Sequence, residues 1–138
     1  MARIYAVDGP EGAVVATVLL EDDSSTTVAL VRTLLKREGC DTVETGSGPG
    51  ALALMNQAKP DLVIVDLKMP EMNGYELPCT MRSDPALRDT PIVFYTAYYD
   101  AAKQCRPPAD VGVTRTVAKS GDTTLLIDAV KDALREAS

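Results

Sequence analysis

The chain has 138 residues, of which 46% are hydrophobic and 25% charged, and this composition is that of one globular domain rather than a disordered or fibrous protein. Its 20 acidic and 14 basic residues give a formal net charge of −6, and the basic residues form no stripe, so we expect no direct contact with nucleic acid. The absence of histidine excludes histidine-based acid–base catalysis, histidine-containing triads and most transition-metal sites.

Apolar runs and cysteines bear on the cellular setting. No apolar run approaches the ~20 residues of a membrane span, and the N-terminus has no long apolar core of the secretory type. We therefore expect a cytoplasmic protein with no membrane partner. The three cysteines, Cys40, Cys79 and Cys105, form no C-x-x-C pair, which favours reduced thiols over disulfides or a zinc knuckle.

Short apolar runs alternate with segments whose apolar residues recur at helical spacing. The clearest strand is residues 62–65, because four consecutive apolar residues fit a strand covered on both faces, at the centre of a parallel sheet. The sequence predicts strands at residues 14–20, 42–45, 62–65, 92–95 and 113–118, and helices from the Ser24–Ser25 cap to Glu38, from the glycine-rich loop 46–50 to Pro60, from Tyr75 to Arg82, and from an Asp122 or Thr123 cap onward.

Two segments fit this alternation less well. Residues 4–7 form a short β-like run before a dense turn signal, so we interpret residues 1–16 as an N-terminal arm or extra strand that precedes one domain at residues 17–138. Residues 98–112 are irregular, because Pro107–Pro108 prevents a longer helix there. The order is (βα)₅, which predicts an α/β fold with a doubly wound, five-stranded parallel sheet.

Polar side chains follow four of the predicted strands. Asp22 and Asp23 follow the first strand, Asp66 follows the third, Thr96 ends the fourth and Lys119 follows the fifth. Because parallel strands end at one edge of a sheet, we expect these side chains to meet there. Three close carboxylates repel one another unless a cation offsets them, and Mg²⁺ is the economical candidate. An ammonium and a hydroxyl complete a set suited to phosphoryl transfer onto Asp66.

Simpler interpretations of the same residues are also open. Asp66 alone would serve to cap the turn that follows its strand. Lys119 would form no more than a buried salt bridge with Asp22 or Asp23. The glycines of loop 46–50 invite a phosphate-binding interpretation, but their spacing departs from the dinucleotide motif, and a helix start with an early proline explains them.

Taken together, the strand-end motifs resemble the receiver domain of two-component response regulators, with its flavodoxin-like fold, over residues 17–137. The resemblance implies that Asp66 accepts a phosphoryl group from the phosphohistidine of a sensor histidine kinase or a histidine phosphotransfer protein in a phosphorelay. The matching stretches are Leu20–Ser24, Val65–Pro70 with Asn73–Gly74, Tyr95–Ala97 and Ala118–Ser120.

The resemblance also implies roles for the neighbours of Asp66. Asp22, Asp23 and Asp66, with the backbone carbonyl of Lys68, would hold Mg²⁺. Thr96 would be the switch hydroxyl and Lys119 the phosphate-binding lysine. Such a chain is a phospho-acceptor switch rather than an enzyme, because it catalyses only its own phosphorylation and dephosphorylation. It would signal to an unknown output protein, and a homodimer is one expected form.

Four further positions matter for the comparison with the family: two are expected to affect the lifetime of the phosphoryl group, and two differ from the usual family residue. Lys68 and Tyr98, each two residues after a site residue, would adjust the lifetime of the phosphoryl group. Thr116 stands where the family usually has an aromatic switch residue, and Ser120 replaces the usual proline after the lysine.

Three other functions are compatible with parts of this sequence. One is a pseudo-receiver that binds partners without phosphate. A Mg²⁺-dependent aspartyl phosphatase would need a second acid at the position of Lys68. A flavodoxin-like cofactor binder would need a hydroxyl-rich phosphate loop where Glu21–Asp23 stand.

Overall fold

Four consecutive apolar residues, Leu62–Val65, form strand β3, and all four are buried in the middle of a five-stranded sheet. The computed structural model describes residues 15–66, 73–96, 115–119 and 123–137. The strand order is β2-β1-β3-β4-β5, and every neighbouring pair is parallel, as the sequence predicted. The other strands are β1 (Thr17–Glu21), β2 (Asp41–Thr45), β4 (Ile92–Thr96) and β5 (Arg115–Ala118).

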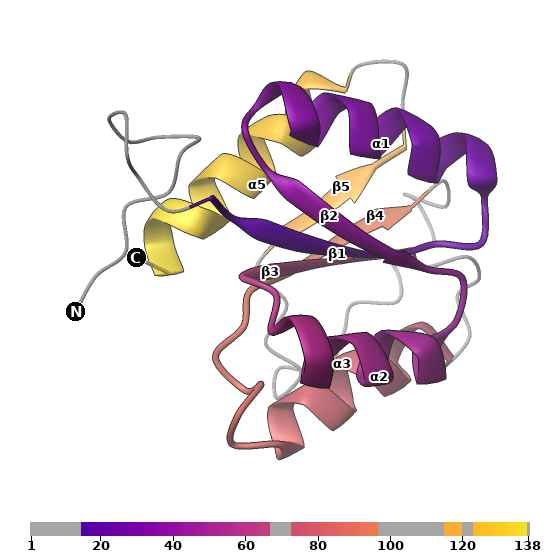
Figure 1. Ribbon diagram of the computed structural model, residues 1–138, viewed down its shortest axis with the longest axis vertical. Coiled ribbons are helices and arrows are strands. Elements are labelled where there is room, and N and C mark those ends of the chain that lie inside the picture. Colours follow the sequence, from indigo (N-terminus) through magenta and orange to yellow (C-terminus); the bar gives the residue numbers. More distant parts are fainter. Residues whose placement is uncertain (1–14, 67–72, 97–114, 120–122, 138) are drawn as a thin grey trace.

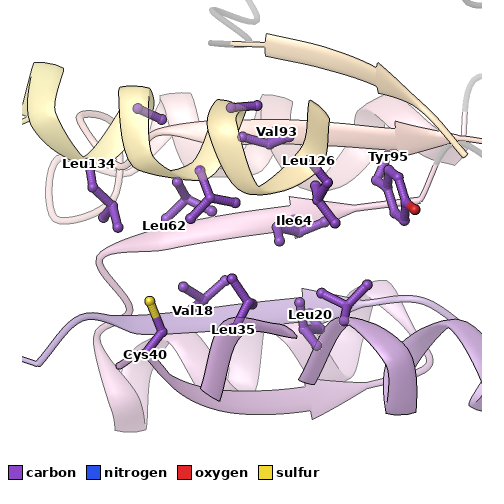
Figure 2. Packing of buried hydrophobic residues seen from close by; sticks show 14 of the residues in the cluster. Val18, Leu20, Leu35, Cys40, Leu62, Ile64, Val93, Tyr95, Leu126 and Leu134 are labelled. Carbon is purple, nitrogen blue, oxygen red and sulfur yellow. The ribbon is translucent and has the colours of Figure 1, made fainter. Parts of the chain in front are cut away.

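Helices cover both faces of the sheet (Figure 1), which makes it doubly wound. Helices α1 (Ser25–Arg37) and α5 (Thr124–Ala137) lie on one face, and α2 (Gly48–Ala58) and α3 (Asn73–Ser83) on the other. Each face has its own apolar cluster; Figure 2 shows the one beneath α1 and α5. In the described part of the chain, no helix combines the length and apolar character needed to cross a membrane.

The first strand begins later than the sequence predicted. β1 starts at Thr17 because its pairing starts there: Thr17 is the register partner of Asp41, and its N–H donates to Oδ2 of Asp61 over 2.8 Å. The strand then continues to Glu21, next to the predicted acids. The predicted run at residues 4–7 and the irregular segment 98–112 lie outside the described residues.

The boundaries of α1 follow the predicted capping residues, whereas α3 begins two residues before the predicted Tyr75. Ser24 caps α1, since its hydroxyl accepts from the N–H of Thr27 over 3.3 Å, and Gly39, with φ 82°, lies just past the helix end. The glycine-rich loop is a helix start: Ser47 Oγ accepts from the N–H of Gly50 over 3.1 Å, and a proline lies in the first turn. This geometry agrees with the simpler interpretation of that loop.

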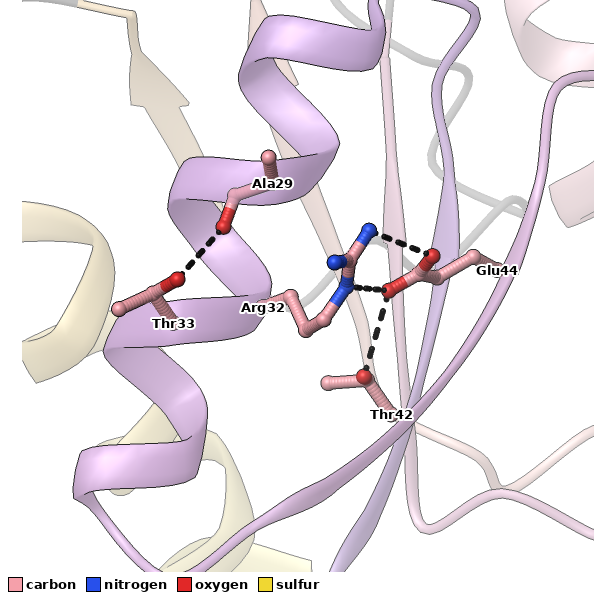
Figure 3. Close-up of polar contacts among 5 residues, drawn as sticks. All are labelled: Ala29, Arg32, Thr33, Thr42 and Glu44. Carbon is pink, nitrogen blue, oxygen red and sulfur yellow. Dashed lines mark hydrogen bonds and ion pairs between the residues drawn. The ribbon is translucent and has the colours of Figure 1, made fainter.

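An ion pair ties the edge strand β2 to α1 (Figure 3). The Arg32 guanidinium donates to both carboxylate oxygens of Glu44, with 2.5 Å from Nε to Oε2 and 3.1 Å from Nη2 to Oε1. Thr42 adds a longer hydrogen bond of 3.5 Å to the same carboxylate. Charged side chains along an edge strand discourage pairing with other chains.

The cysteines with described surroundings carry free thiols, as predicted. Cys40 is buried in the cluster beneath α1 and α5, whereas Cys79 on α3 is exposed. Cys105 lies outside the described residues.

Candidate functional site

The site lies where the strand order reverses direction, between β1 and β3, which is the usual place for ligands in open α/β sheets. Glu21 and Val65 are register partners at the ends of these strands, so Asp22 and Asp66 follow side by side. The backbone holds both acids in place. The N–H of Asp66 donates to the carbonyl of Glu21, and the N–H of Asp22 donates to the carbonyl of Thr45, each over 3.0 Å.

Three carboxylates converge at this edge, as the sequence predicted. Oxygens of Asp22, Asp23 and Asp66 lie within 4.8 Å of one another. Asp22 and Asp66 are buried, with 8% and 9% of their surface exposed, and Asp23 is exposed. The donor set consists only of oxygen atoms, which suits a hard divalent cation such as Mg²⁺ and not a soft metal. The residues therefore fit the magnesium site that the resemblance implies.

Asp22 is the most constrained of the three acids. Its Oδ1 accepts a hydrogen bond of 2.8 Å from the backbone N–H of Ser24, the residue that caps α1. Its Oδ2 accepts from Nζ of Lys119, also over 2.8 Å. The positive end of the α1 dipole adds to this support for a carboxylate. One turn and one distant lysine thus fix the orientation of the Asp22 carboxylate.

Lys119 reaches the site from the end of β5. Its Nζ lies 2.8 Å from Oδ2 of Asp22 and 3.4 Å from Oδ2 of Asp66, and its side chain is 16% exposed. Burial by itself lowers the pKa of Lys119, but the hydrogen bond to Asp22 and the charges of Asp66 and Asp22 outweigh it, so the pKa is raised. The ammonium therefore stays charged at neutral pH. The salt bridge foreseen by the simpler interpretation is present, and it includes Asp66.

Thr96 and Lys119 are held next to each other by the pairing of β4 with β5. Thr96 is the register partner of Ala118, and the N–H of Lys119 donates to the carbonyl of Thr96 over 2.6 Å. Thr96 is fully buried. Thr116, at the position of the usual aromatic switch residue, is exposed and pairs in register with Phe94.

One contact of the site was missed at the level of sequence. Nζ of Lys119 lies over the ring of Tyr95, 5.7 Å from its centroid. The available signal was an aromatic residue directly before the strand-end threonine, but the pattern assigned Tyr95 to the core alone. Lys68 and Tyr98, for which roles were predicted, lie outside the described residues.

Comparisons with known proteins agree on one family. The chain matches the response regulator receiver domain over residues 18–131, a range that contains all five predicted strand-end residues. It is 33% identical over 82 residues to the polar-differentiation response regulator DivK of Brucella ovis, covering 59% of this chain and 67% of that protein.

Solved structures show the same likeness. A putative response regulator from Chloroflexus aurantiacus has a TM-score of 0.77 at 29% identity, covering 88% of this chain and 98% of that one. The chemotaxis response regulator CheY4 of Vibrio cholerae has a TM-score of 0.76 at 27% identity, covering 86% and 98%.

Proposed function

This chain belongs to the response regulator receiver domain family, and from that premise we propose that Asp66 accepts a phosphoryl group and that the chain acts as a phosphorylation-dependent switch. The observation that carries the proposal is the cluster of three carboxylates with Lys119 bridging two of them. Receiver domains are signalling switches rather than conventional enzymes. The chemistry we propose is accordingly limited to phosphorylation and dephosphorylation of Asp66.

The proposed step is an in-line displacement at phosphorus. A carboxylate oxygen of Asp66 attacks the phosphorus of a phosphohistidine, an O–P bond forms, and the P–N bond breaks as the imidazole leaves with its electron pair. These 138 residues contain no histidine, so the phosphohistidine lies outside them, on a sensor histidine kinase or a histidine phosphotransfer protein. Lys119, already 3.4 Å from Asp66, offsets charge on the phosphoryl oxygens.

Asp22, Asp23 and Asp66, with the backbone carbonyl of Lys68, are the ligands that we propose for Mg²⁺. The ion, when bound, supplies positive charge beside the phosphoryl oxygens. The chain contributes the orientation of its acids: the Asp22 carboxylate is held by the N–H of Ser24 and by Lys119.

Thr96 and Lys119 provide the proposed switch. The phosphoryl oxygens attract the Lys119 ammonium and the Thr96 hydroxyl, and this favours one of two conformations that an output partner distinguishes. Thr96 is fully buried, so a change in its hydrogen bonding affects the packing at the end of β4. A homodimer is one form in which the switch would be read. In this proposal the receiver comprises residues 17–138 and follows an arm at residues 1–16. It acts in the cytoplasm, where the kinase obtains its phosphoryl group from ATP.

The test is intact mass spectrometry after incubation with acetyl phosphate, with and without Mg²⁺. We expect the wild-type chain to gain one phosphoryl group only with Mg²⁺, and Asp66→Asn to gain none. Asp128→Asn is the matched control, because it removes an exposed carboxylate on α5, away from the site. A wild-type chain that gains no mass would contradict the proposal and favour a binding module that works without phosphate.

A further inference from the structure

The ring of Tyr95 is a third partner of the Lys119 ammonium, beside the carboxylates of Asp22 and Asp66. Nζ lies over the ring at 5.7 Å from its centroid. A cation within about 6 Å of an aromatic face is attracted by the ring quadrupole, and the attraction grows where water is excluded. Tyr95 is 4% exposed, so this contact is shielded from solvent.

We propose that Tyr95 is a positioning residue for Lys119, whose ring holds the ammonium at the strand-end site independently of the two carboxylates. The inference deepens the proposed function and rests on it, since Lys119 acts there on the phosphoryl group. Tyr95 itself contacts no reacting atom in this scheme.

A neutral aromatic ring complements the two carboxylates as a partner of Lys119. A lysine side chain is flexible and loses much rotamer freedom when it is held in one place. The carboxylates hold Nζ through charge, but Asp66 is the group that changes in the proposed step: once one of its oxygens is bonded to phosphorus, it is no longer a carboxylate anion. The ring of Tyr95 keeps its attraction for the ammonium throughout. It therefore keeps Nζ close to Asp66, within reach of the phosphoryl oxygens that attract it in the proposed switch.

The ring is well fixed for this purpose. Tyr95 belongs to β4, where it is the register partner of Val117 on β5, two residues before Lys119. Figure 2 shows it beyond Ile64 and Leu126, at the end of the cluster toward which the strands run. Tyr95 and Asp22 also line one small cavity, whose other walls are mostly apolar: Leu20, Thr27, Val28, Val31 and Ile64. Low polarity around the ring strengthens its attraction for a cation.

The direct test is the NMR chemical shift of the Lys119 ε-methylene group, assigned by comparison with Lys119→Met. Nuclei above the face of an aromatic ring are shifted upfield, so we expect an upfield shift in the wild type and in Tyr95→Phe. Tyr95→Leu, which keeps an apolar side chain but removes the ring, should lose it. A purely structural role for Tyr95 in the core would give no such signature at Lys119.

The second measurement is the initial rate of phosphorylation by acetyl phosphate at saturating Mg²⁺. Tyr95→Leu should be slower by about three- to tenfold, the range expected for loss of a shielded cation–π contact, and Tyr95→Phe should stay within about twofold of wild type. Val31→Ala is the packing control, because Val31 lines the same cavity without contributing a ring. It should leave the rate nearly unchanged.

The outcomes separate this inference from the function on which it rests. An unshifted ε-methylene in the wild type overturns the inference, and so does a Val31→Ala rate as low as that of Tyr95→Leu. If the wild-type chain accepts no phosphoryl group at all, the proposed function fails, while the methylene shift still decides whether the ring holds Lys119.

Discussion

Nζ of Lys119 donates a hydrogen bond of 2.8 Å to Oδ2 of Asp22, although the two residues are 97 positions apart in the chain. The bond joins the end of β5 to the end of β1, and β3 and β4 lie between them in the sheet. A partly buried ion pair of this kind is weak evidence for stability, because desolvation offsets much of its attraction. The pair is better explained by the proposed function, in which the ammonium of Lys119 must lie beside the carboxylates of the site.

Lys119→Met tests that arrangement. The variant loses the ammonium that lies beside the buried carboxylates of Asp22 and Asp66, so we expect a loss of roughly 1–3 kcal/mol in the free energy of unfolding at pH 7. Phosphorylation by acetyl phosphate should slow by about tenfold or more. Urea unfolding and intact mass measure the two effects.

Lys131→Met is the matched control for the lysine substitution. Lys131 pairs with Glu38 over 3.1 Å, between α5 and α1 and away from the site. If it impairs phosphorylation as much as Lys119→Met does, the effect is one of general charge rather than position.

Asp23→Asn should weaken the binding of Mg²⁺ and increase the stability of the metal-free protein. The variant removes one of three mutually repelling carboxylates, so without metal it should be more stable by on the order of 1 kcal/mol. It should also lose most of the stabilisation that Mg²⁺ gives the wild type, because one proposed ligand is gone. Thermal unfolding with EDTA and with MgCl₂ measures both. A variant that is less stable in EDTA would show that Asp23 has a structural role instead.

Tyr98→Ala should shorten the lifetime of the phosphoryl group. Tyr98 lies outside the described residues, and its proposed role rests on its position two residues after Thr96, where a bulky ring would shield the acyl phosphate from water. The decay of the phosphorylated form after removal of the donor gives the rate. Tyr99→Ala is the neighbouring control and should decay as the wild type does. Equal rates for all three proteins would remove Tyr98 from the mechanism.

Cys40 should make stability depend on pH in the alkaline range. Burial, with added effects of Glu38, Asp41 and Asp61, raises the pKa of the Cys40 thiol from 9.0 to about 11. Between these values the unfolded thiol ionises and the folded one does not, so the unfolded state releases a proton and stability falls as pH rises. Relative to Cys40→Ala, the wild type should lose up to about 2–3 kcal/mol from pH 8 to pH 11 in chemical unfolding. Parallel pH profiles would contradict this assignment.

Gly50 is required by close packing at the start of α2. A Cβ at this position would overlap Thr45 Oγ1 and lie 2.9 Å from Ser47 Oγ, the capping oxygen. Gly50→Ala should therefore cost about 1–2 kcal/mol in thermal unfolding. Gly46→Ala is the control, because its Cβ would come no nearer than 3.7 Å to Asp23. Adding Thr45→Ala should restore most of the loss; failure to do so would place the strain elsewhere.

Much of the fold was predictable because its signals are local. Ser24 and Gly39 bound α1 through the hydrogen bonds of adjacent residues, and the continuous apolar run 62–65 indicated a strand buried on both faces. The start of β1 was predicted too early, since an apolar run alone does not show where a partner strand begins. Its pairing with Asp41 of β2 sets that point.

The sequence by itself determined the order of strands and helices and the polar residue types that follow the strands, because periodicity, caps and turns act over a few residues. Only the tertiary structure decided which of those residues touch. That Lys119 contacts Asp22 and Asp66 and lies over Tyr95 depends on the order β2-β1-β3-β4-β5 and on the register between strands. Contacts between segments distant in the chain follow from packing of the whole sheet, which no local pattern encodes.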